Sequence, residues 1–132
     1  MGVERELNRF NECMNKIDHV LTDRGSKYAV TGIQATSKAE AVRAIKTLCR
    51  KKKFAKATHN TWALLQADGT QIKNDDGESG AGAIILRMLV EKGIENTMIV
   101  VTRWYGGVHL GGDRFRHVKT CVQAYVDEFG HS

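Results

Sequence analysis

Two glycine-rich segments on either side of one hydrophobic segment constrain this chain more than any other feature. They cover residues 75–82 and 106–112 and together contain seven glycines. Glycine is used where the backbone needs a positive φ or must approach another group closely, so both segments are predicted to be tightly shaped loops that open helices. Between them, residues 97–102 form a continuous apolar and β-branched run. Such a run predicts a strand that is buried on both faces at the centre of a sheet.

Length and composition place few limits beyond the general class. The chain has 132 residues, 42% of them hydrophobic and 27% charged, which is typical of a single soluble globular domain. No apolar run is long enough to span a bilayer, and residues 1–9 lack the apolar core of a secretory signal. Cys13, Cys49 and Cys121 form no C-x-x-C pair, which favours reduced core thiols over disulfides or zinc. We therefore expect a cytoplasmic location.

The positive charge of the chain is concentrated in one segment. Residues 38–56 hold eight of the twenty Lys and Arg residues and one acidic residue, Glu40. Such a cluster fits attraction to phosphate backbones or to an acidic protein partner, although a solvated helix face produces the same pattern.

Hydrophobic periodicity predicts alternating strands and helices. An amphipathic helix is predicted over residues 1–20, from the stripe Val3, Leu7, Phe10, Met14 and Ile17. A capping box at Ser37 and Glu40 begins a second helix that runs to about Lys52. Further helices end at Gly93 and begin near Gly112 or Asp113, and strands are expected at residues 19–22, 27–36, 58–66, 71–74 and 97–102. This order predicts an α+β or mixed-sheet sandwich with helices mostly on one face.

The two loops contain groups that could bind an anion or a metal ion. Helix starts present free N–H groups, and Arg103, Arg114 and Arg116 could add contacts to a phosphate or carboxylate. Capping of the following helix by Asp76 and Glu78 is an equally simple explanation of the first loop. Asp75, Asp76 and Glu78 could also hold Mg²⁺, but their spacing is not that of an EF-hand, and we predict no metal site.

His59 and the aromatic pair Trp104 and Tyr105 are the other candidates for function. His59 could act as a general base with the carboxylates at 75–78, yet a histidine without an identified nucleophile is more often structural. Trp104 and Tyr105 follow the buried strand, where they could stack on a base, anchor a protein partner or close the core.

Four blocks of sequence together resemble the IMPACT family. They are Ala57-Thr58-His59-Asn60, Asp75-Asp76-Gly77-Glu78, the segment 100–107 ending in Trp104-Tyr105-Gly106-Gly107, and the segment 110–115 with Gly111-Gly112-Asp113-Arg114. The resemblance covers about residues 26–127, and the aromatic residues make it similar to the eukaryotic branch. It implies a two-layer fold similar to the second domain of ribosomal protein S5, with a mixed four-stranded sheet and helices on one face.

The resemblance also implies a function in translational control without catalysis or a cofactor. Eukaryotic members of the family bind the large ribosome-associated activator of the general control kinase, which phosphorylates initiation factor 2. Our leading hypothesis is therefore a regulatory protein-binding domain. An RNA- or ribosome-binding module and a small-anion or phosphoester enzyme are the alternatives. The expected binding residues are Arg50, Lys51, Lys52, Lys53, His59, Asp76, Gly77, Glu78, Arg103, Trp104, Tyr105, Gly106, Gly107 and Arg114.

Overall fold

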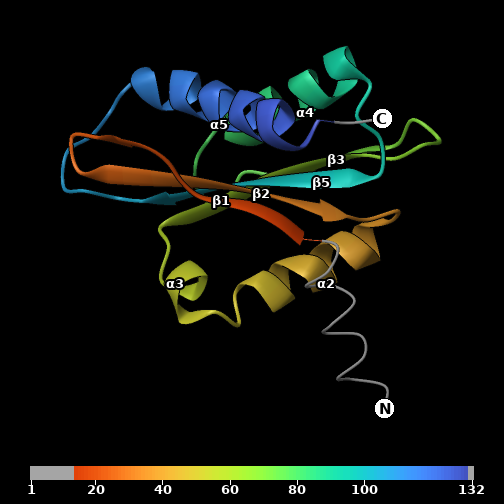
Figure 1. The fold of residues 1–132 in the computed structure, drawn as a ribbon, viewed down its shortest axis with the longest axis horizontal. Helices are drawn as coiled ribbons and strands as arrows, with labels where there is room; N and C mark the ends of the chain where they lie inside the picture. Colours follow the sequence, from red (N-terminus) through yellow and green to blue (C-terminus); the bar gives the residue numbers. More distant parts are fainter. Residues whose placement is uncertain (1–13, 131–132) are drawn as a thin grey trace.

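The computed structural model describes residues 14–130, which form one antiparallel sheet between two layers of helices (Figure 1). The sheet has five strands in the order β1-β2-β5-β3-β4, and every neighbouring pair is antiparallel. The elements are, in chain order, β1 (Met14–Asp23), β2 (Ser26–Gln34), α2 (Lys38–Leu48), α3 (Lys52–Ala55), β3 (His59–Leu65), β4 (Gln71–Asn74), α4 (Ala81–Lys92), β5 (Thr97–Trp104) and α5 (Asp113–Phe129).

The central position of β5 explains its uninterrupted apolar sequence. Side chains on a strand alternate between the two faces of the sheet, so both faces of β5 must be apolar if both are covered. Ile99 and Val101 belong to a core under α4 and α5, whereas Met98 and Val100 belong to a second core over α2 and α3. The prediction of a central strand buried on both faces is confirmed.

Local signals fix the ends of the helices. The Ser37 side chain accepts a hydrogen bond from the Glu40 amide at 3.1 Å, and the Glu40 carboxylate accepts one from the Thr36 amide at 2.6 Å, so the predicted capping is present with the return bond one residue earlier. Gly93 ends α4 in the left-handed conformation at φ 66°, as expected. The predicted helix to Lys52 instead stops at Leu48, and α3 starts separately at Lys52 and buries Phe54 under the sheet.

The expected arrangement of layers was wrong in two respects. The sheet is not mixed and four-stranded, because it has five strands and only antiparallel pairs. The helices do not share one face: Figure 1 shows α4 and α5 on one side and α2 and α3 on the other, each pair over its own core. The apolar run of β5 already implied cover on both faces, and short α3 with its buried Phe54 completes the second layer.

The predicted N-terminal helix is also corrected where it can be compared. Residues 1–13, which include Val3, Leu7, Phe10 and Cys13, lie outside the described residues, but residues 14–20 belong to β1. The pairing of β1 with β2 shifts register between Ile17 and Leu21. Met14 packs on the core over α2 and α3, and Ile17 packs on the core under α4 and α5. A strand with apolar residues on both faces thus shows a spacing of three that also suits a helix.

The helices of the described part of the chain do not reach the length and apolarity needed to cross a membrane. Cys49 and Cys121 are free thiols, and Cys121 is buried in the core under α4 and α5. The two-core architecture leaves the loops at the sheet ends as the places where polar side chains can gather.

Candidate functional site

The two glycine-rich loops meet at one end of the sheet. Strands β4 and β5 both run antiparallel to β3, so they point the same way, and the loops that follow them leave the sheet at the same end. The first loop crosses to α4 and the second crosses to α5, and Gly80 lies against Phe115, whose ring atom is 3.3 Å from the position of an added Cβ. Segments 75–82 and 106–112 are therefore neighbours in the fold.

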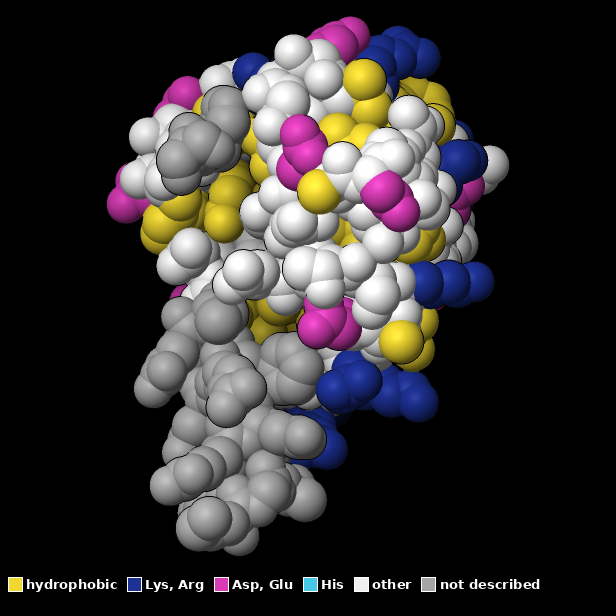
Figure 2. Space-filling view, turned by 90° about the vertical axis from the view of Figure 1, so that its right-hand side faces the viewer, with side chains coloured by type: hydrophobic (Ala, Val, Ile, Leu, Met, Phe, Trp, Pro, Cys, Tyr) yellow, Lys and Arg dark blue, Asp and Glu magenta, His cyan; other side chains and the backbone are white. Residues whose placement is uncertain are grey.

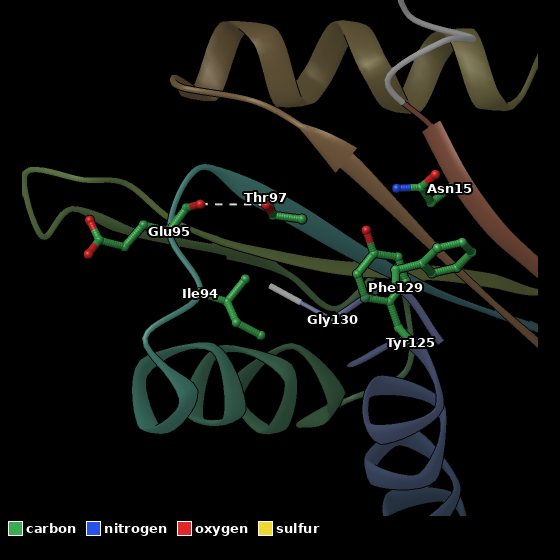
Figure 3. A pocket seen from close by; sticks show the side chains of 7 residues that line it. All are labelled: Asn15, Ile94, Glu95, Thr97, Tyr125, Phe129 and Gly130. Carbon is green, nitrogen blue, oxygen red and sulfur yellow. Dashed lines mark hydrogen bonds between the residues drawn. The ribbon is translucent and has the colours of Figure 1, made fainter. Parts of the chain in front are cut away.

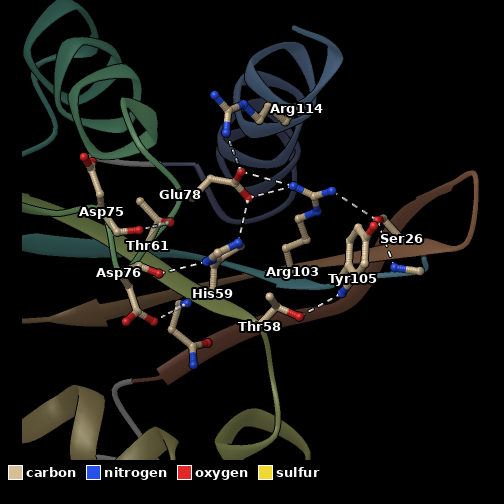
Figure 4. A network of polar contacts seen from close by, with 12 residues as sticks. Ser26, Thr58, His59, Thr61, Asp75, Asp76, Glu78, Arg103, Tyr105 and Arg114 are labelled. Atoms are coloured by element: carbon tan, nitrogen blue, oxygen red, sulfur yellow. Dashed lines mark hydrogen bonds and ion pairs between the residues drawn. The ribbon is translucent and has the colours of Figure 1, made fainter. Parts of the chain in front are cut away.

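A buried carboxylate joins the two loops. Glu78 is only 3% exposed, and its two oxygens each accept a hydrogen bond from Arg103 Nη1 at 3.1 Å (Figure 4). Arg114 on α5 approaches the same carboxylate at 3.4 Å. Arg103 is itself 6% exposed, so the pair is removed from water. Such a pair holds its loops in one geometry, because separating either partner would leave an unpaired buried charge.

The β1–β2 hairpin is bound to the same cluster through Ser26. The Ser26 hydroxyl receives hydrogen bonds from Arg103 Nη2 at 3.4 Å and from the Gly106 amide at 3.2 Å. Next to it, Gly106 packs so closely on Gly25 that an added Cβ would lie 2.0 Å from the Gly25 carbonyl carbon. Gly106 is required by this backbone contact. Sequence reasoning missed Ser26, because this residue lies in the turn between the strands expected at residues 19–22 and 27–36.

His59 supports the first loop. Its Nδ1 lies 2.9 Å from the Asp76 carbonyl oxygen, and because a carbonyl only accepts, Nδ1 carries the proton in this contact. Nε2 faces Glu78 at 3.8 Å, and Gly77 leaves room for the ring, since a Cβ there would come within 3.1 Å of Nδ1. His59 is therefore occupied by the loop on one side and faces a carboxylate on the other.

Asp75 and Asp76 are used to shape the loop. Asp75 accepts hydrogen bonds from the amides of Gly80 and Gly82 at 3.1 and 2.8 Å, so it satisfies the start of α4. Asp76 accepts from the Asn60 amide at 2.7 Å. Capping of α4 is thus performed by Asp75, and not by Asp76 or Glu78 as the sequence suggested. Among residues 14–130, no group of three or more potential metal ligands is found.

The Ser79 hydroxyl and the Cys121 thiol are poorly placed to act as nucleophiles. Ser79 is exposed in the first loop, and none of its side-chain atoms is hydrogen-bonded to a described base. Burial raises the pKa of the Cys121 thiol to about 12, so this group is protonated at neutral pH. Neither Ser79 nor Cys121 is therefore paired with a base.

Trp104 attaches α3 to the end of β5. Its indole N–H donates to the Lys53 carbonyl at 2.9 Å, and its ring packs on Phe54 with centroids 5.6 Å apart. The Lys53 ammonium lies 5.3 Å from the centre of the same ring, within the range of a cation–π contact. The basic segment and the aromatic pair, which were separate expectations in the sequence, therefore lie side by side.

Tyr105 and the loop after it face the solvent. Tyr105 is 43% exposed and Val108 is 48% exposed, and both belong to the second loop. The Tyr105 amide donates to the Thr58 hydroxyl at 2.9 Å, which fixes the backbone at this point. The loop is therefore firmly attached at its base and presents apolar surface outward.

A shallow groove of about 530 Å³ lies between the β1–β2 hairpin, α3 and the end of β5. We call it the lysine groove; it is lined by Asp18, His19, Gly25, Lys27, Lys53, Trp104 and Tyr105. Lys16 and Lys51 lie beside it, and Lys16 Nζ is 5.4 Å from the centre of the Phe54 ring. Four of the expected binding residues, Arg50, Lys51, Lys52 and Lys53, are exposed, and Lys53 is the one among them that lines the groove. Lys16 and Lys27 were not predicted, since they lie on strands outside the basic segment.

The other hollows found among the described residues lack the combination of lysine and aromatic side chains. One of about 280 Å³ lies between β1, the turn before β5 and the end of α5, where Tyr125 and Phe129 meet Ile94 and Glu95 (Figure 3). No Lys, Arg or His lines it. The end of the molecule that carries the β3–β4 hairpin shows acidic, basic and apolar side chains dispersed among uncharged ones (Figure 2). We use the name loop end for the end of the sheet where loops 75–82 and 106–112 meet. The lysine groove and the loop end together are therefore the strongest candidate for a binding surface.

Comparison with known proteins gives consistent results. The model of the Impact N-terminal domain matches residues 24–126. The chain is 36% identical to the Protein IMPACT homolog of Caenorhabditis elegans, over 83% of this chain and 45% of that protein. It is 35% identical to human Protein IMPACT, over 85% of this chain and 37% of that protein. The chain thus spans less than half the length of these curated relatives.

Solved structures agree with this similarity. The structure of the two-domain translational regulator Yih1 matches with a TM-score of 0.56 and 31% identity, over 89% of this chain and 47% of that chain. A crystal structure of a hypothetical protein matches with a TM-score of 0.66 and 21% identity, over 86% of this chain and 53% of that one, which supports the fold alone.

Proposed function

The chain belongs to the Impact N-terminal domain family, and on this basis we propose that it is a non-enzymatic binding domain in translational control. Its partner in this proposal is a translation-associated protein of the cytoplasm, namely the ribosome-associated activator of the general control kinase that the family resemblance implies. The similarity to the translational regulator Yih1 supports the regulatory part of the proposal.

A binding function is supported by one observation: the polar side chains of the loop end contact one another and the loop backbone. Glu78 and Arg103 are buried against each other, and His59 contacts the loop backbone. These side chains stabilise a fixed surface, and they are not arranged around an open reaction centre. The groups that face outward are exposed lysines of α3 and the apolar side chains of Tyr105 and Val108. A fixed surface with exposed aromatic side chains suits a protein interface, and the lysines beside them would attract an acidic partner.

The proposal is tested by affinity capture from cells of the source organism, with nuclease treatment to remove RNA. Charge reversal of Lys51, Lys52 and Lys53 to Glu is expected to abolish capture of the ribosome-associated partner, identified by mass spectrometry. These side chains are exposed, so the fold should tolerate the change.

The matched control reverses an equal number of exposed charges elsewhere on the basic segment. Lys38, Arg43 and Lys46 lie on α2 and are all exposed. Their reversal to Glu is expected to retain capture. Equal loss in both triple variants would show a general charge effect, and undiminished capture in the Lys51, Lys52 and Lys53 variant would refute the proposed surface.

A further inference from the structure

The lysine groove concentrates positive charge that the described residues do not neutralise. Lys27 and Lys53 line it, and Lys16 and Lys51 lie next to it. None of the ion pairs within residues 14–130 involves a lysine. Asp18 is the one carboxylate of the lining. The groove therefore has an excess of positive charge in a concave site, where a negatively charged ligand gains most.

Burial and neighbouring ammonium groups both act on Lys16, which lies beside the groove. Burial, followed by the close approach and the charge of Lys51, lowers the pKa of Lys16 to about 8; Lys53 acts in the same direction, and Asp18 acts in the opposite one. Holding these charges close together costs free energy in the unbound protein. A ligand that brings several negative charges would remove this repulsion.

The aromatic rings of the groove distinguish between classes of ligand. The Lys53 ammonium lies over the Trp104 ring, and Phe54 packs against it at a tilt of 53°. Tyr105 has the His109 ring 5.5 Å away and the Arg103 guanidinium 5.8 Å from its centre. A nucleobase needs a free aromatic face for stacking, and on Trp104 it would have to displace the Lys53 ammonium or Phe54. Tyr105 is 43% exposed, so part of its ring is open to contact with a single apolar side chain. Carboxylates, in contrast, can reach ammonium groups that the rings already hold in place.

We infer that the lysine groove binds a carboxylate-rich peptide segment of the partner protein, with an apolar side chain of that segment against Tyr105. The inference rests on the proposed function for the assignment of the segment to a protein partner. Lys27 from the β1–β2 hairpin and Lys53 from α3 contact the carboxylates from opposite sides of the groove. Because these ammonium groups sit on two different elements, an extended segment lying across the groove reaches both.

The test is a nuclear magnetic resonance titration of the ¹⁵N-labelled chain. The probe is a short capped peptide rich in glutamate with one leucine, and its control replaces each glutamate by glutamine. The Trp104 indole N–H, which is hydrogen-bonded to Lys53, is expected to shift with the glutamate peptide only. Trp62 is 4% exposed in the core and provides an internal reference that should not shift.

Two single variants separate the groove from general charge. Lys53→Glu is expected to weaken binding of the glutamate peptide by about tenfold or more, because it reverses a charge within the groove. Lys38→Glu makes the same change on an exposed lysine of α2 that does not line the groove, and at most about twofold weakening is expected. Equal effects of the two variants, or equal shifts with the glutamine peptide, would overturn the inference.

A third probe, a uridine oligonucleotide, tests the other class of polyanion. Shifts at Trp104 and Tyr105 with the oligonucleotide, together with none for the glutamate peptide, would overturn the inference in favour of RNA. If the peptide causes no shifts while the cellular partner is still captured, the inference fails and the proposed function stands. If the peptide binds as expected but capture fails, the groove chemistry stands and the proposed partner is wrong.

Discussion

Glu78 shows how one residue fixes the loop end. It follows a loop with left-handed backbone at Asp76 and Gly77, yet its side chain turns inward and is 3% exposed. Arg103, near the end of β5, supplies two hydrogen bonds to the carboxylate, and Arg114 supplies a third. A loop carboxylate is normally solvated, and its burial here is tolerated because two arginines balance its charge.

Glu78→Ala is expected to lower the free energy of unfolding by about 3–5 kcal/mol, because it leaves the Arg103 guanidinium buried without its partner. The measurement is equilibrium unfolding in urea at neutral pH. Glu91→Ala removes an exposed carboxylate of α4 and serves as the control, with an expected change within about 0.5 kcal/mol. A loss for Glu78→Ala no larger than that of the control would contradict a supporting role for the pair.

At the scale of elements, the β1–β2 hairpin is fastened to α5 by a small charge network. Asp23 Oδ1 accepts a hydrogen bond from Arg24 Nε at 3.1 Å. The second carboxylate oxygen, Oδ2, lies 2.7 Å from His117 Nε2 on α5. Arg24 continues to Asp113 in the first turn of α5. The hairpin is thus held against the helix that follows the second glycine-rich loop, and one wall of the lysine groove is held with it.

This network predicts a pH dependence of stability. Hydrogen bonds from Arg24, and then from His117, lower the pKa of Asp23 from 3.8 to about 2. Because the folded pKa lies below the unfolded value, the ionised carboxylate stabilises the fold above pH 3.8, and this contribution is lost as the pH falls towards about 2. Asp23→Asn is therefore expected to reduce stability at neutral pH and to flatten the decline in this acidic range.

The pH prediction is measured by thermal unfolding of the two proteins across the acidic range. Asp18→Asn, on the same strand, changes an exposed carboxylate that has no hydrogen bond from a described side chain and is expected to keep the wild-type slope. If Asp23→Asn declined with acid as steeply as the unchanged protein, the network would not link the hairpin to α5.

Local signals in the sequence were sufficient for most elements. The glycine loops, the Ser37 cap, the Gly93 end of α4 and the central strand are each set by neighbouring residues, and the structure confirms them. The number and faces of the layers depend on long-range pairing. The pairing of β1 with β2 cannot be read from its own irregular pattern, and the break between α2 and α3 follows from the burial of Phe54.

The two loops of the candidate site were predictable from the sequence, but their contacts were not. Glycine spacing and charged residues indicated both loops, and the direction of the strands brought them together. Which carboxylate caps α4 and which pairs with Arg103 is decided by the positive φ of Asp76 and Gly77, which the residue types do not reveal. Ser26, Lys16 and Lys27 join the site only because β1 and β2 lie beside β5 and α3.

At the scale of the whole molecule, one strand supports both cores. Side chains of β5 alternate between the core under α4 and α5 and the core over α2 and α3. If either helical layer were lost, apolar residues of the strand would face water. The two layers are therefore expected to unfold together, and the loop end that both layers support should keep one shape until the whole domain unfolds.

Leu89→Ala and Leu48→Ala test this coupling, since Leu89 is fully buried on the α4 side and Leu48 is 1% exposed on the α2 side. Each is expected to lower the free energy of unfolding by about 2–5 kcal/mol and to leave a single transition. Tryptophan fluorescence follows the α2–α3 side, where Trp62 and Trp104 pack, and thiol labelling of Cys121, resolved by mass spectrometry, follows the α4–α5 side. Both probes should give the same midpoint in both variants, because β5 transmits the loss of either core to the other. A variant in which one probe changes well before the other would show two independent layers.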